Sequence, residues 1–202
     1  MYELLKEILE CIEYVSDSVE NQVAELLETW DRCSRTYAGV VEKINVAWKA
    51  PLDIDLLNEF PDIRMKVAKK LEWLGNEQLG ILQLFLNRFY QINECLKKKL
   101  DNINLKLEHI SFENHMEIKH TVRDHTLWLE ECWVILHCLF MQLEFSIISL
   151  KPNDEDSAKK MVEAAKQDEK DKYSINKINM YKQSCISLLK FLENQNKIKL
   201  IM

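Results

Sequence analysis

Residues 3–47 read ELLKEILECIEYVSDSVENQVAELLETWDRCSRTYAGVVEKINVA and decide the fold class. Apolar residues recur at steps of three and four along this stretch, which is the spacing of one helix face. One extra four-residue step, from Val19 to Val23, forms a stutter in the heptad pattern. We expect a helix of about 67 Å that buries this stripe against other helices. The predicted seam is Ile8, Ile12, Val15, Val19, Val23, Leu26, Trp30, Cys33, Tyr37, Val40 and Ile44.

A second long helix is predicted over residues 61–107, because Pro61 suits a first helical position and a second seam follows it. Gly75 and Gly80 flank an irregular step in this seam, so a kink, a brief break or a continuous helix is consistent with the pattern. We favour the continuous helix. The seam comprises Ile63, Val67, Leu71, Leu74, Leu79, Leu82, Phe85, Phe89, Ile92, Leu96, Leu100, Ile103 and Leu107.

The rest of the chain divides into four segments. Residues 109–123 are polar and unperiodic, which predicts a linker, and residues 124–150 predict a helix that is apolar on nearly all sides. Residues 154–172 are densely charged, which predicts a loosely held surface helix or a mobile crossover. Residues 174–194 predict the C-terminal helix.

Glycine and proline are scarce throughout the chain. Its 202 residues contain three of each, whereas average usage gives roughly 24 together. Sheets joined by tight turns need these residues, so an all-β fold is nearly excluded. The sequence predicts an all-α protein with one domain over residues 1–202, an elongated antiparallel helical bundle with two long N-terminal helices.

Cysteine usage and charge indicate the environment of the protein. Its six cysteines are scattered and form no CxxC pair, which favours reduced thiols in the cytoplasm or nucleus. A net charge of −6 argues against direct binding to nucleic acid. The apolar run from Cys132 to Leu150 is long enough to span a membrane. It contains His137, Gln142 and Glu144, so a helix buried in protein is favoured over a membrane span.

No arrangement of residues predicts catalysis. Glu117 and His120 have the spacing of one half of a diiron site, but such sites need a second pair and two further glutamates. Neither a Walker motif nor a Gly-x-Ser-x-Gly nor a His-Glu-x-x-His motif occurs. We expect no catalytic, cofactor-binding or metal-binding residues. An enzyme with a metal site in a helical bundle is the third and weakest hypothesis.

The excess of apolar residues is the informative feature. Within residues 124–150, Leu129 belongs to one apolar face, while Trp128, Ile135 and Leu139 point elsewhere. Either the bundle uses all of these residues internally, or the helices of a partner complete it. The pattern alone does not decide between these alternatives.

Several strings resemble the AIRIM family of AAA-ATPase-interacting ribosome maturation factors. They are Phe60-Pro61-Asp62 followed by a basic helix, Leu127-Trp128-Leu129-Glu130, the closing Ser187-Leu188-Leu189-Lys190-Phe191-Leu192-Glu193, and the central Trp30 of the first helix. The basic residues that follow Asp62 are Arg64, Lys66, Lys69 and Lys70. The likeness extends over nearly the whole chain.

The resemblance implies a non-catalytic adaptor with no cofactor. Members of the family pair with a second small helical protein and serve a hexameric AAA ATPase that acts on maturing large ribosomal subunits, with a further role at replication forks. The implied location is cytoplasmic and nuclear, and the contact with the pre-ribosomal particle is indirect. The predicted partner interface comprises Phe60, Pro61, Asp62, Trp128, Leu129, Ile135 and Leu139. The alternative is a coiled-coil structural, tethering or kinetochore-type subunit.

Overall fold

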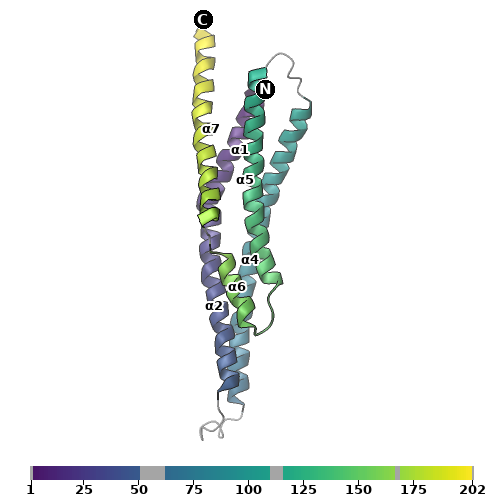
Figure 1. Ribbon diagram of the computed structural model, residues 1–202, viewed down its shortest axis with the longest axis vertical. Coiled ribbons are helices and arrows are strands. Elements are labelled where there is room, and N and C mark those ends of the chain that lie inside the picture. The colour runs from purple at the N-terminus through teal and green to yellow at the C-terminus, as the bar shows by residue number, and fades with distance from the viewer. Residues whose placement is uncertain (1, 51–61, 110–115, 167–168, 202) are drawn as a thin grey trace. The chain divides into compact units, whose positions relative to one another are not determined.

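A computed structural model describes residues 2–50, 62–109, 116–166 and 169–201 of the chain. It is an all-α helical bundle without a β-strand in those residues, which confirms the predicted fold class. Figure 1 shows the helices in chain order. The elements are α1 (Tyr2–Ser18), the π-helical turn η1 (Val19–Val23), α2 (Ala24–Lys49), α4 (Ile63–Glu108), α5 (Met116–Ile148), α6 (Glu155–Ala164) and α7 (Glu169–Ile201).

The helices form two compact units. Helices α4 and α5 supply a segment to each unit, so neither unit is one continuous piece of chain. The prediction of a single domain stays a prediction. Unit 1 comprises Met1–Ala24, Tyr90–Leu139 and Gln167–Met202, and unit 2 comprises Glu25–Phe89 and Phe140–Lys166.

The seam of the first segment is buried as predicted, except for Tyr37, which is half-buried. The stutter coincides with η1, where the backbone N–H of Ala24 donates to the carbonyl of Val19, five residues earlier. A turn closed over five residues is wider than an α-helical turn. The wider turn therefore accommodates the extra four-residue step and keeps Val19 and Val23 in the core, with 4% and 1% of their surfaces exposed.

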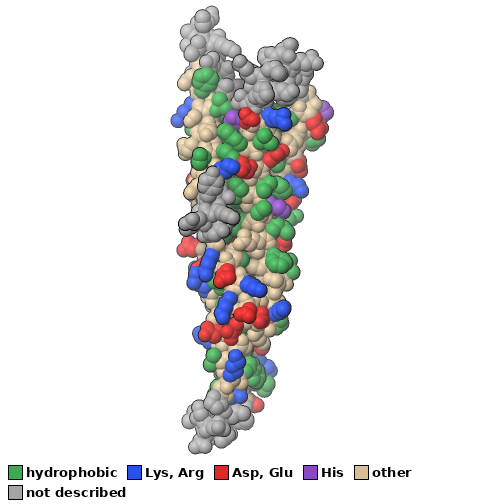
Figure 2. Space-filling model, viewed as in Figure 1, with side chains coloured by type: hydrophobic (Ala, Val, Ile, Leu, Met, Phe, Trp, Pro, Cys, Tyr) green, Lys and Arg blue, Asp and Glu red, His purple; other side chains and the backbone are tan. Residues whose placement is uncertain are grey.

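In unit 1, α1 runs antiparallel to α4 and α7 (Figure 1). Glu7 pairs with Lys106 of α4 at 2.6 Å, whereas Tyr14, later in α1, lies 5.3 Å from the ammonium of Lys99. On the other side, Asp17 pairs with Lys182 of α7 at 2.6 Å. These contacts belong to the surface, where charges of both signs are interspersed with hydrophobic side chains (Figure 2). Exposed pairs contribute little to stability, so apolar burial holds unit 1 together.

Helix α4 runs unbroken through both of its glycines, which is the alternative that the sequence favoured. A Cβ atom at Gly75 would lie 3.4 Å from Val40 and 3.5 Å from Tyr37, so glycine permits a close approach between α2 and α4. The predicted seam of α4 is wrong at its start, because Ile63 and Val67 are 39% and 45% exposed.

Two predicted connections are corrected. The linker assigned to residues 109–123 ends earlier, since α5 begins at Met116 rather than at Asp124. The charged segment over residues 154–172 contains a well-anchored helix, α6, whose Ala158 and Met161 are buried. Asp154 caps this helix by accepting a hydrogen bond from the backbone N–H of Ser157 at 2.9 Å. The C-terminal helix α7 is longer than the predicted 174–194.

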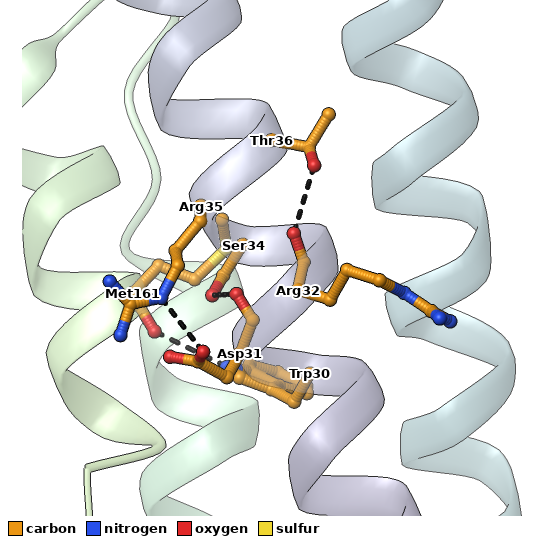
Figure 3. Close-up of polar contacts among 7 residues, drawn as sticks. All are labelled: Trp30, Asp31, Arg32, Ser34, Arg35, Thr36 and Met161. Carbon is orange, nitrogen blue, oxygen red and sulfur yellow. Dashed lines mark hydrogen bonds and ion pairs between the residues drawn. The ribbon is translucent and has the colours of Figure 1, made fainter.

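Side chains from α2 and α5 satisfy the carbonyl groups at the end of α6 in unit 2. The indole N–H of the buried Trp30 donates to the carbonyl of Met161 at 3.2 Å (Figure 3). The N–H of Ala165, which an α-helix would direct to that carbonyl, donates to Glu163 instead. The side-chain amide of Gln142 donates to the carbonyl of Ala164 at 3.3 Å. Trp30 therefore fills the core of unit 2 and caps α6 at once.

Replacing Trp30 with phenylalanine should lower the free energy of unfolding by about 1–3 kcal/mol, because the carbonyl of Met161 loses its donor in a buried place. The matched control is Trp73→Phe, since Trp73 is 65% exposed and should change stability by less than about 0.5 kcal/mol. Urea unfolding followed by far-UV circular dichroism measures both. Equal stabilities of the two variants would contradict the assigned role of Trp30.

Candidate interaction surface

The residues of the predicted interface occupy different environments. Phe60 and Pro61 lie outside the described residues, and Asp62 is exposed directly before α4. Leu129 has no exposed surface, so it belongs to the core of unit 1 rather than to a surface that a partner can reach. The half-buried members are Trp128, Ile135 and Leu139.

Trp128 packs within unit 1 instead of lying bare. Its ring stacks on Tyr181 of α7, with centroids 4.8 Å apart and planes inclined by 8°. Glu131, one turn further along α5, accepts hydrogen bonds from the ammonium of Lys177 and the hydroxyl of Tyr181. His125 joins this cluster by packing against Trp128, with the two ring centroids 4.4 Å apart. The cluster joins α5 to α7, which is a structural role.

The polar contacts in this cluster shift the pKa values of its members. The hydrogen bond from Lys177, and after it that from Tyr181, lowers the pKa of Glu131. The same hydrogen bond to Glu131 raises the pKa of Lys177. Burial, followed by the hydrogen bond to Glu131, raises the pKa of Tyr181. At neutral pH the carboxylate and the ammonium are therefore charged, and the phenol is neutral.

The side of α5 opposite the buried Leu129 carries exposed apolar side chains every seven residues. Leu127, Val134, Met141 and Ile148 are 50%, 47%, 46% and 73% exposed, and Phe145 beside them is 70% exposed. We name these five residues the α5 outer face. Seven residues make nearly two turns of a helix, so these side chains form one stripe along α5. A stripe with this repeat is the pattern of a helix that packs against another helix.

The inner side of α5 accounts for its other apolar residues. Leu129, Leu136, Phe140 and Leu143 are buried, with at most 6% of any residue exposed. Leu129 follows Leu127 by two residues, which places them about 200° apart around the helix. Hydrophobic side chains also reach the surface over the region of α4 and α5 in Figure 2. Helix α5 is therefore apolar on both sides, and only its inner side is covered.

Among the described residues, one helix is long and apolar enough to cross a membrane by length and composition. It is the stretch Val122–Ile148 of α5, in which 28% of the most apolar window is buried. The core helices of soluble proteins can meet the same criterion of length and composition, and such helices are mostly buried. This stretch is not mostly buried, so its apolar surface needs another explanation.

Other candidate sites in the described part of the chain lack the side chains of a metal-binding or catalytic site. No three His, Cys, Asp or Glu side chains among the described residues are arranged to hold a metal ion. Two hollows in unit 2 have volumes of about 380 and 340 Å³. Charges of both signs line the first, and mainly apolar residues line the second, with no His, Cys or Ser among their described linings. The α5 outer face is the strongest candidate that remains.

No residue of the α5 outer face is among those predicted from the sequence to form the partner interface. Trp128, Ile135 and Leu139 were expected to point away from the apolar face of Leu129 and to meet a partner, and the structure places them half-buried. The seven-residue spacing of Leu127, Val134, Met141 and Ile148 was visible in the sequence, but the buried Leu129, Leu136 and Leu143 have the same spacing, so it does not tell which side of α5 is exposed. A strict seven-residue repeat marks a helix seam even when a second seam lies on the same helix.

Comparisons with known proteins returned no match to a family model, a curated protein or a solved structure. A functional assignment therefore depends on the geometry of the chain and on the short sequence strings described above.

Replacing Glu131 with glutamine should lower stability at neutral pH and have no effect in acid. The ordinary carboxyl pKa is about 4.3, and the pKa of Glu131 in the folded protein is lower. The charged form therefore stabilises the fold above that range, and this stabilisation is lost as the pH falls through the lowered value. Because solvent screens the pair, we expect a difference of about 0.5 kcal/mol at pH 7.

Chemical denaturation of the wild type and the variant at a series of pH values measures this difference. Glu130→Gln is the adjacent control, because Glu130 forms no ion pair with a described residue. A difference that persisted unchanged well below pH 4 would show that the charge of Glu131 is not its source.

Proposed function

We propose that this protein is a non-catalytic interaction subunit and that the α5 outer face binds a partner protein. The observation that carries the proposal is the exposed seven-residue series from Leu127 to Ile148. Contiguous apolar surface of this kind on a soluble protein is typical of an interaction site. Scattered exposed apolar residues are common and need no partner, but a regular series on one helix is not scattered.

We propose further that the partner complex is an AAA ATPase assembly acting in maturation of the large ribosomal subunit. The resemblance of three short strings and of Trp30 to the AIRIM family supports this specific role. In that role the chain is an adaptor that pairs with a second small helical protein, contacts the pre-ribosomal particle indirectly and works in the cytoplasm and nucleus, with a further role at replication forks. The α5 outer face supports an interaction subunit in general.

Affinity purification of the tagged full chain from its native cells tests both levels of the proposal. The wild type should recover an AAA ATPase and a second small helical protein at low salt. The variant with Met141→Glu and Phe145→Glu should lose at least one of them, because charge on the outer face opposes burial.

The matched control carries Met180→Glu and Phe191→Glu on α7, where the same two residue types are 64% and 57% exposed. This control should recover the wild-type set of proteins. Recovery of neither protein by the wild type would overturn the AAA adaptor. Loss of the partners in both variants would remove the outer face from the proposal, and a stable homodimer in light scattering would favour the coiled-coil structural subunit.

A further inference from the structure

Within the segment of α5 that carries the outer face, the charged residues are all acidic. From Asp124 to Leu150 the chain contains Asp124, Glu130, Glu131 and Glu144, and neither lysine nor arginine. The carboxylate of Glu131 is engaged by Lys177 and Tyr181. Glu130 and Glu144 are half-buried and form no ion pair with a described residue. Their charges therefore remain available to a partner.

These two carboxylates lie within the heptad pattern. Glu130 follows Leu127 by three residues, and Glu144 follows Met141 by three residues. With Leu127, Val134, Met141 and Ile148 at one seam position of the heptad and Phe145 at the other, Glu130 and Glu144 flank the seam, where charged side chains pair with the partner helix. A partner of the α5 outer face consequently approaches both carboxylates at close range.

This charge pattern disfavours a second copy of α5 as the occupant. In a parallel pair of α5 helices Glu130 and Glu144 would meet a segment of the other copy that contains neither lysine nor arginine. In an antiparallel pair they would also meet a segment without lysine or arginine. Like charges at a helix interface cost free energy, whereas opposite charges select the partner.

A lipid bilayer fits the acidic residues less well than a protein does. Glu130, Glu131 and Glu144 fall inside the stretch that is long enough to span hydrocarbon. Charged carboxylates are costly at that depth. A strict seven-residue repeat also has no advantage in lipid, because lipid tails carry no matching periodicity.

We infer that the occupant of the α5 outer face is an α-helix of another protein, with an apolar heptad stripe flanked by lysine or arginine. This inference depends on the proposed function, because it names the partner class for the same surface. The apolar stripe of that helix covers Leu127, Val134, Met141 and Ile148, and its basic residues pair with Glu130 and Glu144.

Two synthetic peptides, each about four heptads long, test this inference. Both carry leucine at the seam positions, with lysine at the flanking positions of one and glutamate at those of the other. Fluorescence anisotropy with the full chain should give at least about tenfold tighter binding for the lysine peptide, and added salt should reduce this preference. Equal affinities would overturn the inference.

Two paired variants separate local charge from the net charge of the protein. The variant with Glu130→Gln and Glu144→Gln should lose most of the preference for the lysine peptide. The control with Glu42→Gln and Glu72→Gln removes two exposed acidic residues of α2 and α4 and should keep it. An equal loss in both variants would mean that the peptide senses only net charge, which contradicts the inference.

Thiol protection locates the bound peptide. Cys138, on the same side of α5 as Met141, and Cys95 of α4 are both exposed. The lysine peptide should slow alkylation of Cys138 and leave that of Cys95 unchanged. Protection of Cys95 alone would contradict the inference, and so would protection of Cys138 by zwitterionic phospholipid vesicles or by self-association of the chain.

The outcomes distinguish this inference from the proposed function. If the chain recovers the AAA ATPase from cells while both peptides bind with equal affinity, the inference of a basic partner helix is wrong and the proposed interaction subunit is retained. If the lysine peptide binds selectively while the cells yield no partner, the surface recognises such a helix and the proposed AAA role fails.

Discussion

Burial of apolar side chains along helix seams is the interaction on which the rest of this structure depends. The continuous seam from Ile8 to Ile44 is covered almost entirely, and the π-helical turn at Val19–Val23 keeps it on one side of the chain. The surface ion pairs add little to this. Helix α5 is the exception, since its apolar residues extend around the helix and only the inner ones are covered.

The uncovered apolar residues of α5 link the fold to a function. The same helix supplies Leu129 to the core of unit 1 and Phe140 to the core of unit 2, while Met141 and Phe145 remain exposed. A helix needed only for the core would carry polar residues on its outward side. The outward apolar residues are not buried by the rest of the chain, and their regular spacing supports an external helix as the partner.

Periodicity predicted the parts of the fold in which a single face of a helix is buried. The first seam and the continuity of α4 through Gly75 are correct for this reason. The start of α5 at Met116 was missed, because polar residues hide a helix that lacks an apolar stripe there. The anchoring of α6 was missed as well, since it depends on Trp30, which is distant in sequence.

The candidate surface was harder to predict than the fold. A helix with two apolar sides gives no sequence signal that tells the inner side from the outer, because neighbouring helices decide it. The residues Trp128 and Leu129 were therefore assigned to a partner although Tyr181 covers one and the core encloses the other. The seven-residue repeat that begins at Leu127 is visible in the sequence, but only the packing of the helices shows that these side chains are exposed.

Comparing Leu127→Ala with Leu129→Ala in equilibrium unfolding tests the two-sided character of α5 most directly, because the residues are of one type and lie two positions apart. Leu129 is fully buried and Leu127 is 50% exposed. We expect the free energy of unfolding to fall by about 2–5 kcal/mol for Leu129→Ala and by less than about 0.5 kcal/mol for Leu127→Ala. Equal losses would contradict this expectation, because Leu127 would then belong to the core and the outer face would not be free for a partner.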